Sequence, residues 1–277
     1  MSKSTPPIES SIMDTSDPHP IFLVRWIKIG WLFSWLVIAT VLVFPPITLV
    51  SLFSKTGNGM FHLARFWAWL ILKISAVHVV VRGADKIDRT RSYMIIANHQ
   101  SHFDGPALAW GLGGLQFRWI AKKELLEIPL FGHCLNSSRN IFIDRTNRES
   151  AHASIQEGMA MLPTGAGVMC FAEGTRSNTG RVGPFKKGGF AAALQRGVPL
   201  LPITINGSRH VLPKGSLVFR RGIIELVIAD PIETAGKSSD DLDDLIKVTR
   251  QVILSNHLSQ QEAGPADAGG RSAAEMV

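Results

Sequence analysis

A histidine and an aspartate stand five positions apart in a short polar segment, at His99 and Asp104. An imidazole titrates near neutrality, so His99 can take a proton from a hydroxyl group under working conditions. A carboxylate on one ring nitrogen would fix the tautomer and stabilise the imidazolium that forms. A regular helix does not align positions i and i+5, but a turn that enters a helix can fold Asp104 back onto His99. The pair therefore predicts general-base catalysis, with His99 as the base.

A metal site is the alternative for this segment, because it also contains His102. Three ligands this close in sequence can meet on a turn. However, no further carboxylate or cysteine stands at a recognised metal-ligand spacing. We therefore expect no bound metal.

Other polar clusters carry groups that bind anions. Arg145 and Arg176 can each make bidentate contacts to a phosphate, and the amides of Gly174-Thr175 can approach a ligand closely. Lys122 adds a further positive charge. Any one of these basic residues is more often a solvated charge, but together they indicate a phosphate pocket. Two roles remain open for Glu173, which could bind a substrate hydroxyl or anchor one of the two arginines.

Short apolar runs alternate with helical patterns from about residue 76, which predicts a layered α/β domain with a largely parallel sheet and flanking helices. A capping box at Thr146–Glu149 opens one helix, and others are expected at Gly188–Arg196 and Ser238–His257. Four polar clusters directly follow predicted strands, so we expect them to meet at one edge of the sheet. The predicted strands are His78–Val81, Tyr93–Ala97, Phe117–Ala121, Ile141–Ile143, Val168–Phe171, Leu200–Ile205 and Ile223–Ile228.

The N-terminal region is strongly apolar. Residues Gly30 to Ser54 form a run of 25 without a charged side chain, which is long enough to span a membrane. Pro45-Pro46 should break or kink a helix there. A second apolar segment, Met60–Val81, contains tryptophans and basic residues that suit the headgroup boundary. We expect a helical hairpin in one leaflet, with a true span of the first helix as the open alternative.

Four parts follow from these patterns. Residues 1–20 form a disordered lead, 21–75 the membrane-associating hairpin, 76–257 the catalytic domain and 258–277 a disordered tail.

The chain is basic, with a net charge of +7, and residues 71–236 hold 20 Lys and Arg against 12 Asp and Glu. Such a centre suits an anionic membrane surface or a phosphorylated substrate. Nucleic acid is disfavoured as a partner, because the basic residues form no dense arm and one tyrosine leaves little stacking surface.

The chain resembles the glycerolipid acyltransferases of the 1-acyl-glycerol-3-phosphate acyltransferase family in four ordered blocks. The blocks are Asn98–Asp104, Ile141–Arg145, Phe171–Ser177 and Val198–Ile203. A histidine and an aspartate at this spacing are a weak signal alone, whereas four blocks in order are specific. Two departures occur: Ala172 stands where the family usually has proline, and Arg139-Asn140 replaces its usual glycine.

The resemblance implies the glycerolipid acyltransferase fold and a direct transfer without metal, cofactor or acyl-enzyme intermediate. His99 would deprotonate the acceptor hydroxyl, Asp104 would orient His99, and Pro202 would shape the acyl side of the site. Acyl carrier protein or coenzyme A would deliver the acyl thioester, and lysophosphatidic acid would become phosphatidic acid in phospholipid biosynthesis. The residues implied to bind the glycerol phosphate are Arg145, Glu173, Gly174, Thr175, Arg176 and Lys122.

Three alternatives stay open. The acceptor could be another lyso-lipid, such as a lyso-ornithine lipid. His99 could activate water in a membrane-bound thioester or ester hydrolase, or the chain could bind lipid without catalysis. For the leading hypothesis we expect a phospholipid membrane as partner, at the bacterial inner membrane with the catalytic domain facing the cytoplasm.

Overall fold

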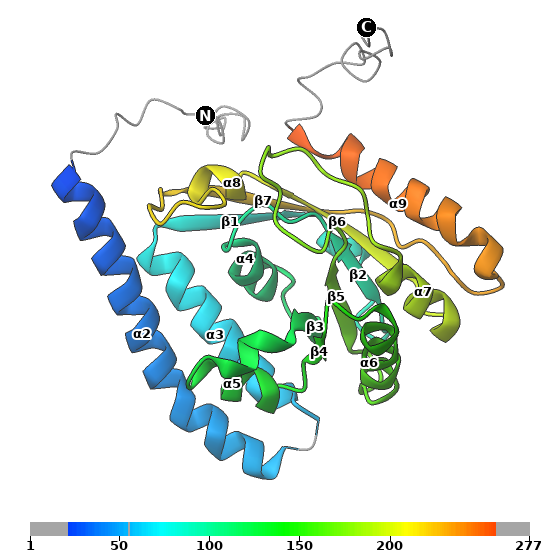
Figure 1. Ribbon diagram of the computed structural model, residues 1–277, viewed down its shortest axis with the longest axis horizontal. Coiled ribbons are helices and arrows are strands. Elements are labelled where there is room, and N and C mark those ends of the chain that lie inside the picture. The colour runs from blue at the N-terminus through cyan, green and yellow to red at the C-terminus, as the bar shows by residue number, and fades with distance from the viewer. Residues whose placement is uncertain (1–21, 55, 259–277) are drawn as a thin grey trace, which may run out of the picture.

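A computed structural model describes residues 22–54 and 56–258 of the chain (Figure 1); the predicted lead at 1–20 and nearly all of the predicted tail at 258–277 lie outside these residues. Every predicted strand forms, and each end lies within one residue of its expected position. The strands are β1 (Val77–Arg82), β2 (Met94–Ala97), β3 (Phe117–Lys122), β4 (Ile141–Ile143), β5 (Gly167–Phe171), β6 (Leu200–Asn206) and β7 (Gly222–Ile228). The helices are α2 (Phe22–Phe53), α3 (Asn58–Ile74), α4 (Asp104–Gly111), α5 (Phe131–Ser137), α6 (Arg148–Ala160), α7 (Lys187–Arg196), α8 (Ser208–Val211) and α9 (Leu242–Ser255), with short 3-10 helices η1 (Ala84–Lys86), η2 (Lys123–Glu127) and η3 (Ser239–Asp241).

The strands form one sheet in the order β1-β7-β6-β2-β5-β3-β4. All neighbouring strands are parallel except β6 and β7, which pair antiparallel. The expected largely parallel sheet is therefore confirmed. The central strand β2 is completely buried between β5 and β6, so the segment that follows it leaves the sheet from its most rigid point.

Helices cover both faces of the sheet, as Figure 1 shows. Side chains alternate along β2, because successive residues of a strand point to opposite faces. Ile95 and Ala97 pack in the cluster that includes residues of α3 and α4, whereas Met94 and Ile96 pack with residues of α6, α7 and α9. This three-layer arrangement confirms the layered α/β class.

The N-cap of α6 differs from the sequence expectation. The side chain of Asn147 accepts a hydrogen bond from the backbone N–H of Ser150 at 3.0 Å, so Asn147 is the cap. Thr146 instead donates to Asp144 Oδ1 at 2.6 Å. The capping box predicted at Thr146 is wrong by one residue, because the Asp144 carboxylate holds Thr146 in the preceding turn.

Helix α2 is long, apolar and largely exposed. It continues through Pro45 and Pro46, and Figure 1 shows its C-terminal part changing direction, which fits the kink that two missing backbone donors produce. The large side chains of Leu42, Leu52 and Phe53 are 62%, 73% and 81% exposed. By length and composition, Leu23–Phe53 is the one helix among the described residues that could cross a membrane.

Arg118, on β3, ties the sheet to the turn between α2 and α3. Its side chain is 1% exposed. The guanidinium Nη2 donates to Thr56 O at 2.8 Å and to Asn58 Oδ1 at 2.7 Å. Gly57, between these partners, has a left-handed φ of +79° that favours glycine. No carboxylate in the described part of the chain pairs with Arg118, and burial lowers its pKa to about 10.

We predict that Arg118→Met lowers the free energy of unfolding by about 1 to 3 kcal/mol, because Thr56 O and Asn58 Oδ1 in the α2–α3 turn lose their charged donor. Thermal or denaturant unfolding measures the loss, and hydrogen exchange at residues 56–58 locates it. Lys122→Met, an exposed position on the same strand, is the matched control and should change stability by less than about 0.5 kcal/mol. Equal effects of the two substitutions would contradict the role of Arg118 in holding the α2–α3 turn.

The residues after α9 pack against the segment that follows β2. His257 is 3% exposed, and the amide Nε2 of Gln100 donates to its ring Nε2 at 2.6 Å. A ring nitrogen that accepts this bond carries no proton, so the contact requires neutral His257. Burial lowers the pKa of His257 to about 4.

This burial predicts acid sensitivity. Between about pH 6.5 and pH 4 the unfolded chain binds a proton at His257 that the folded chain does not, so stability falls as pH decreases through this window. The expected loss is on the order of 3 kcal/mol. Denaturant unfolding at pH 7 and pH 4 measures it, and His257→Gln should remove this part of the pH dependence. Identical pH profiles for the two proteins would refute the assignment.

Candidate active site

The end of β2 is locked to β6 by Asn98. This side chain is fully buried, and its Oδ1 accepts from Ile205 N at 2.7 Å while its Nδ2 donates to Ile205 O at 3.0 Å. An amide that satisfies both backbone groups of one residue fixes two neighbouring strands against each other. His99 therefore begins from an immobile backbone position at the carboxyl end of the sheet.

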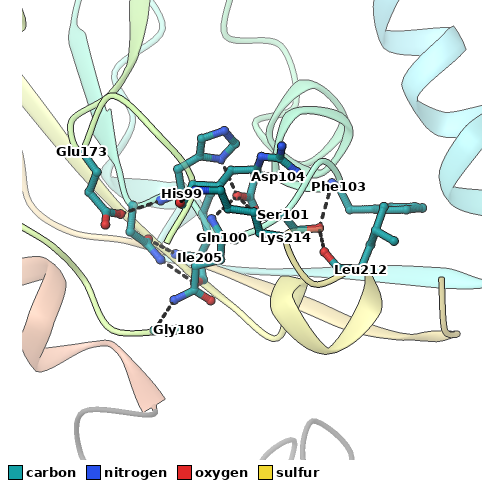
Figure 2. A network of polar contacts seen from close by, with 12 residues as sticks. His99, Gln100, Ser101, Phe103, Asp104, Glu173, Gly180, Ile205, Leu212 and Lys214 are labelled. Atoms are coloured by element: carbon teal, nitrogen blue, oxygen red, sulfur yellow. Dashed lines mark hydrogen bonds and ion pairs between the residues drawn. The ribbon is translucent and has the colours of Figure 1, made fainter. Parts of the chain in front are cut away.

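Asp104 starts α4 and folds back onto the segment before it (Figure 2). Its carboxylate is fully buried, and one oxygen, Oδ2, accepts from the Gln100 N–H at 2.7 Å, the Ser101 N–H at 2.9 Å and His99 Nδ1 at 2.7 Å. A carboxylate in the first turn of a helix is also favoured by the helix dipole. The predicted return of position i+5 onto position i is thus achieved by a turn closed by one oxygen atom.

This contact sets the tautomer of His99. Because Asp104 Oδ2 is an acceptor, His99 Nδ1 carries the hydrogen, and Nε2 keeps its lone pair. No protein group in the described residues bonds Nε2. The His99 side chain is 20% exposed, so Nε2 can receive a proton from an incoming group.

Aromatic rings fix the plane of the imidazole. His99 stacks on Phe171 with ring centroids 3.8 Å apart and an angle of 11° between the planes. Trp119, on β3, stacks in turn on Phe171 at 5.8 Å. These three side chains come from adjacent parts of the sheet, so the sheet itself supports the ring that Asp104 orients.

Glu173 holds the backbone on the other side of His99, as Figure 2 shows. Its Oε1 accepts from His99 N at 2.9 Å and its Oε2 accepts from Gly183 N at 2.8 Å. Burial raises the pKa of this carboxyl, while the two N–H donors act in the opposite direction. Of the two roles left open for Glu173, the structure does not support the anchoring of Arg145 or Arg176, because both carboxylate oxygens accept from backbone amides.

The loop from β5 to α7 is fastened along its length to the His99 segment. Ser177 N donates to His99 O at 2.8 Å, and Gln100 Nε2 donates to Gly180 O at 2.6 Å. Lys214 Nζ reaches Arg176 O at 2.9 Å from the chain after α8. This loop, residues 172–186, therefore lies bound over the carboxyl ends of β2 and β5, and we call it the strap.

Several of the predicted phosphate ligands gather on this strap. Arg145 Nη1, from the segment after β4, donates to Gly174 O at 2.7 Å, and Gly174 adopts a left-handed φ of +72°. Thr175 is exposed and Arg176 is half-buried. Arg176 directly precedes Ser177, whose N–H donates to His99 O, so the backbone of Arg176 lies beside the His99 segment. Arg145 and Arg176 thus lie on or against the loop whose backbone binds the His99 segment.

Two predicted site residues stand apart from this cluster. Lys122 is exposed at the end of β3, and none of its contacts among the described residues joins it to the His99 network. Pro202 is buried inside β6 opposite Ile96, three positions before His99, and it lies just before the residues that pair with β7. The absence of an N–H at Pro202 therefore costs no β6–β7 bond.

The three possible metal ligands do not converge. Within residues 22–54 and 56–258, no group of three or more His, Cys, Asp or Glu side chains lies close enough to hold a metal ion. His102 is exposed, whereas the Asp104 carboxylate is buried and already accepts from three donors.

Sequence reasoning missed four contributors: the stacking rings of Phe171 and Trp119, the strap-binding amide of Gln100, and Lys214. Phe171 and Gln100 lie inside blocks that the motif singles out, so the motif marked them without their roles. Trp119 and Lys214 carry no local signal, because only the sheet order and the chain after α8 bring them here.

Comparison with known proteins identifies the family of this chain. A family model described as Acyltransferase matches residues 78–206. The chain is 30% identical over 209 residues to a 1-acyl-sn-glycerol-3-phosphate acyltransferase from Limnanthes douglasii, covering 75% of this chain and 72% of that protein. It is 33% identical over 174 residues to a protein of the same name from Pseudomonas aeruginosa, covering 62% and 66% respectively.

The fold is also similar to a solved structure. The 1-acyl-sn-glycerophosphate acyltransferase PlsC from Thermotoga maritima superimposes with a TM-score of 0.72 at 25% identity, over 90% of this chain and 99% of that one. Family model, relatives and fold agree with the four sequence blocks. This chain is an enzyme that belongs to the acyltransferase family.

Proposed function

We propose that this acyltransferase moves a fatty acyl group from an acyl thioester to the free hydroxyl of 1-acyl-glycerol-3-phosphate, forming phosphatidic acid. The observation that carries the proposal is the pair formed by His99 and Asp104, in which Asp104 Oδ2 contacts Nδ1 and leaves Nε2 without a protein partner among the described residues. The names of the relatives support the acceptor.

His99 Nε2 removes the proton of the acceptor hydroxyl as its oxygen attacks the thioester carbonyl. The new C–O bond forms, the C–S bond breaks, and the imidazolium returns the proton to the departing thiolate. Asp104 stabilises the imidazolium through Nδ1 and prevents the ring from turning. The stack on Phe171 limits the imidazole to one plane, so Nε2 is aimed before the acceptor binds.

The strap supplies the acceptor site in this proposal. Arg176 and Arg145 bind the phosphate, and Gly174 and Thr175 offer a close backbone approach and a hydroxyl. Lys122 contributes long-range attraction from the end of β3. Glu173 supports the site by holding the backbone of His99 and of the strap.

In this proposal the membrane supplies the lipid acceptor and holds the catalytic domain close to it. The exposed apolar side chains of α2 suit a lipid environment, and we propose that residues 21–75 anchor the catalytic domain of residues 76–257 at a membrane. A bacterial inner membrane with the domain in the cytoplasm would give access to acyl carrier protein or coenzyme A thioesters.

The proposal is tested with detergent-solubilised protein, labelled acyl-coenzyme A or acyl carrier protein, and a panel of acceptors. Phosphatidic acid should form from lysophosphatidic acid faster than products form from lyso-ornithine lipid or monoacylglycerol. Preference for another lyso-lipid would overturn the acceptor. Fatty acid released without any acceptor would indicate a hydrolase instead.

We predict that His99→Ala lowers kcat by at least about 10²-fold, because the general base is lost. Asp104→Asn should lower kcat as well, since an amide presents a donor or a weaker acceptor to Nδ1. Steady-state rates and circular dichroism separate chemistry from folding. His78→Ala, an exposed histidine on the edge strand β1, is the matched control and should keep full activity. Substantial turnover by the His99 variant would eliminate it as the base.

For the phosphate site, Arg176→Gln should raise KM for lysophosphatidic acid about tenfold or more, the size expected for one charged hydrogen bond. KM for monoacylglycerol, which has no phosphate, should hardly change. Arg221→Gln removes an equal charge from an exposed position before β7 and should leave both values unaltered. A uniform change with both acceptors would speak against phosphate binding by Arg176.

A further inference from the structure

Two arginines lie together at the end of α4 that is remote from Asp104. Arg65, on α3, donates from Nε to Ala109 O at 3.1 Å. Arg89 lies against the turn after α4, where a Cβ on Gly113 would stand 3.2 Å from its Nη2. Partial burial and the positive charge of Arg89 both lower the pKa of Arg65. No carboxylate among the described residues forms an ion pair with either arginine.

An aromatic hollow of ≈ 320 Å³ opens beside Arg65. Its guanidinium carbon stands 5.7 Å from the centroid of the Trp110 ring, and Phe66 stacks on Trp69 at 5.6 Å. Phe66 is 51% exposed and Trp110 is 41% exposed. The lining residues are His62, Arg65, Phe66, Trp69 and Trp110.

This hollow is separate from the catalytic centre. Trp110 lies six residues along α4 from Asp104, about 9 Å at the helical rise. Arg89 precedes β2 and Gly113 precedes β3, so the hollow opens toward the amino ends of the strands. His99, in contrast, lies at their carboxyl ends.

The hollow lies on one of the two N-terminal helices. Helix α3, which supplies four of its lining residues, packs on α2, and Trp67 Nε1 donates to Thr40 Oγ1 at 3.3 Å across their contact. Exposed tryptophan and phenylalanine beside an arginine that has no carboxylate partner suit the boundary between lipid headgroups and acyl chains. Two close guanidinium groups without a carboxylate suit the phosphate of an anionic lipid.

We propose that Arg65 and Arg89, with the aromatic hollow between α3 and α4, bind the headgroup phosphate of an anionic phospholipid of the surrounding bilayer. The inference rests on the membrane association proposed above. The guanidinium groups bind the phosphate, and the rings of Phe66, Trp69 and Trp110 lie against the glycerol and upper acyl chain. Such a site would orient the catalytic domain on the membrane surface.

The test measures partition of the full chain onto phosphatidylcholine vesicles and onto vesicles that also contain phosphatidylglycerol. Wild-type protein should bind the second kind more tightly. Arg89→Gln should reduce this gain about fivefold, the effect expected for one positive charge near an anionic surface. Arg196→Gln, an equal charge loss at an exposed position on α7 across the sheet, is the matched control and should keep the gain. Equal losses in the two variants would overturn the site.

Different results would contradict the membrane association and the headgroup site. Absence of binding to either vesicle would contradict membrane association itself. Binding to both vesicles with a full gain in Arg89→Gln would remove only the headgroup site. Acyl transfer in detergent and thermal unfolding should be the same for Arg89→Gln as for the wild type. A loss of either would show that Arg89 acts on catalysis or folding and would overturn the assignment.

Discussion

Three donors meet at one oxygen atom of Asp104, and the geometry of the whole catalytic end of the molecule depends on this convergence. Two of the donors are backbone amides, so the carboxylate shapes the turn; the third is the ring nitrogen of His99, so the same atom aims the base. Because the carboxylate is fully buried, water cannot replace it as an acceptor. The same oxygen atom therefore holds the turn and orients the base.

The surroundings extend this constraint in two directions. Asn98 locks the preceding backbone to β6, and Glu173 ties the following strap to His99. Each uses a side chain to satisfy backbone groups that a strand end would otherwise leave unpaired. The consequence is that a loop, usually the most mobile kind of segment, carries candidate ligands at a fixed distance from the base.

The N-terminal helices are attached to the catalytic domain by contacts of a different kind. Helix α2 presents apolar side chains outward, and its attachment to the domain includes polar contacts such as those of buried Arg118 with the α2–α3 turn. A guanidinium without a carboxylate partner is favourable there only because several oxygen acceptors surround it. These contacts of Arg118 fix α3, and with it the aromatic hollow, relative to the sheet that carries His99.

Local sequence patterns determined the strands, their polar carboxyl-end segments and the identity of His99 and Asp104 as a pair. These features depend on period-2 apolar runs and on residue types at short spacing, which act within a few positions of the chain. The same patterns misjudged the α6 cap by one residue, since Asp144 competes for Thr146. They left the membrane placement of the hairpin open.

Only the tertiary structure decided what the buried carboxylates and the aromatic side chains do. Glu173 binds amides 74 and 10 positions away in the chain, and Trp119 reaches the His99 stack because β3 pairs with β5. Partners at such separations are chosen by strand order and not by neighbouring residues. The sequence by itself therefore determined which groups could react, whereas the packing of the sheet decided which way they face, because orientation depends on contacts made across the whole fold.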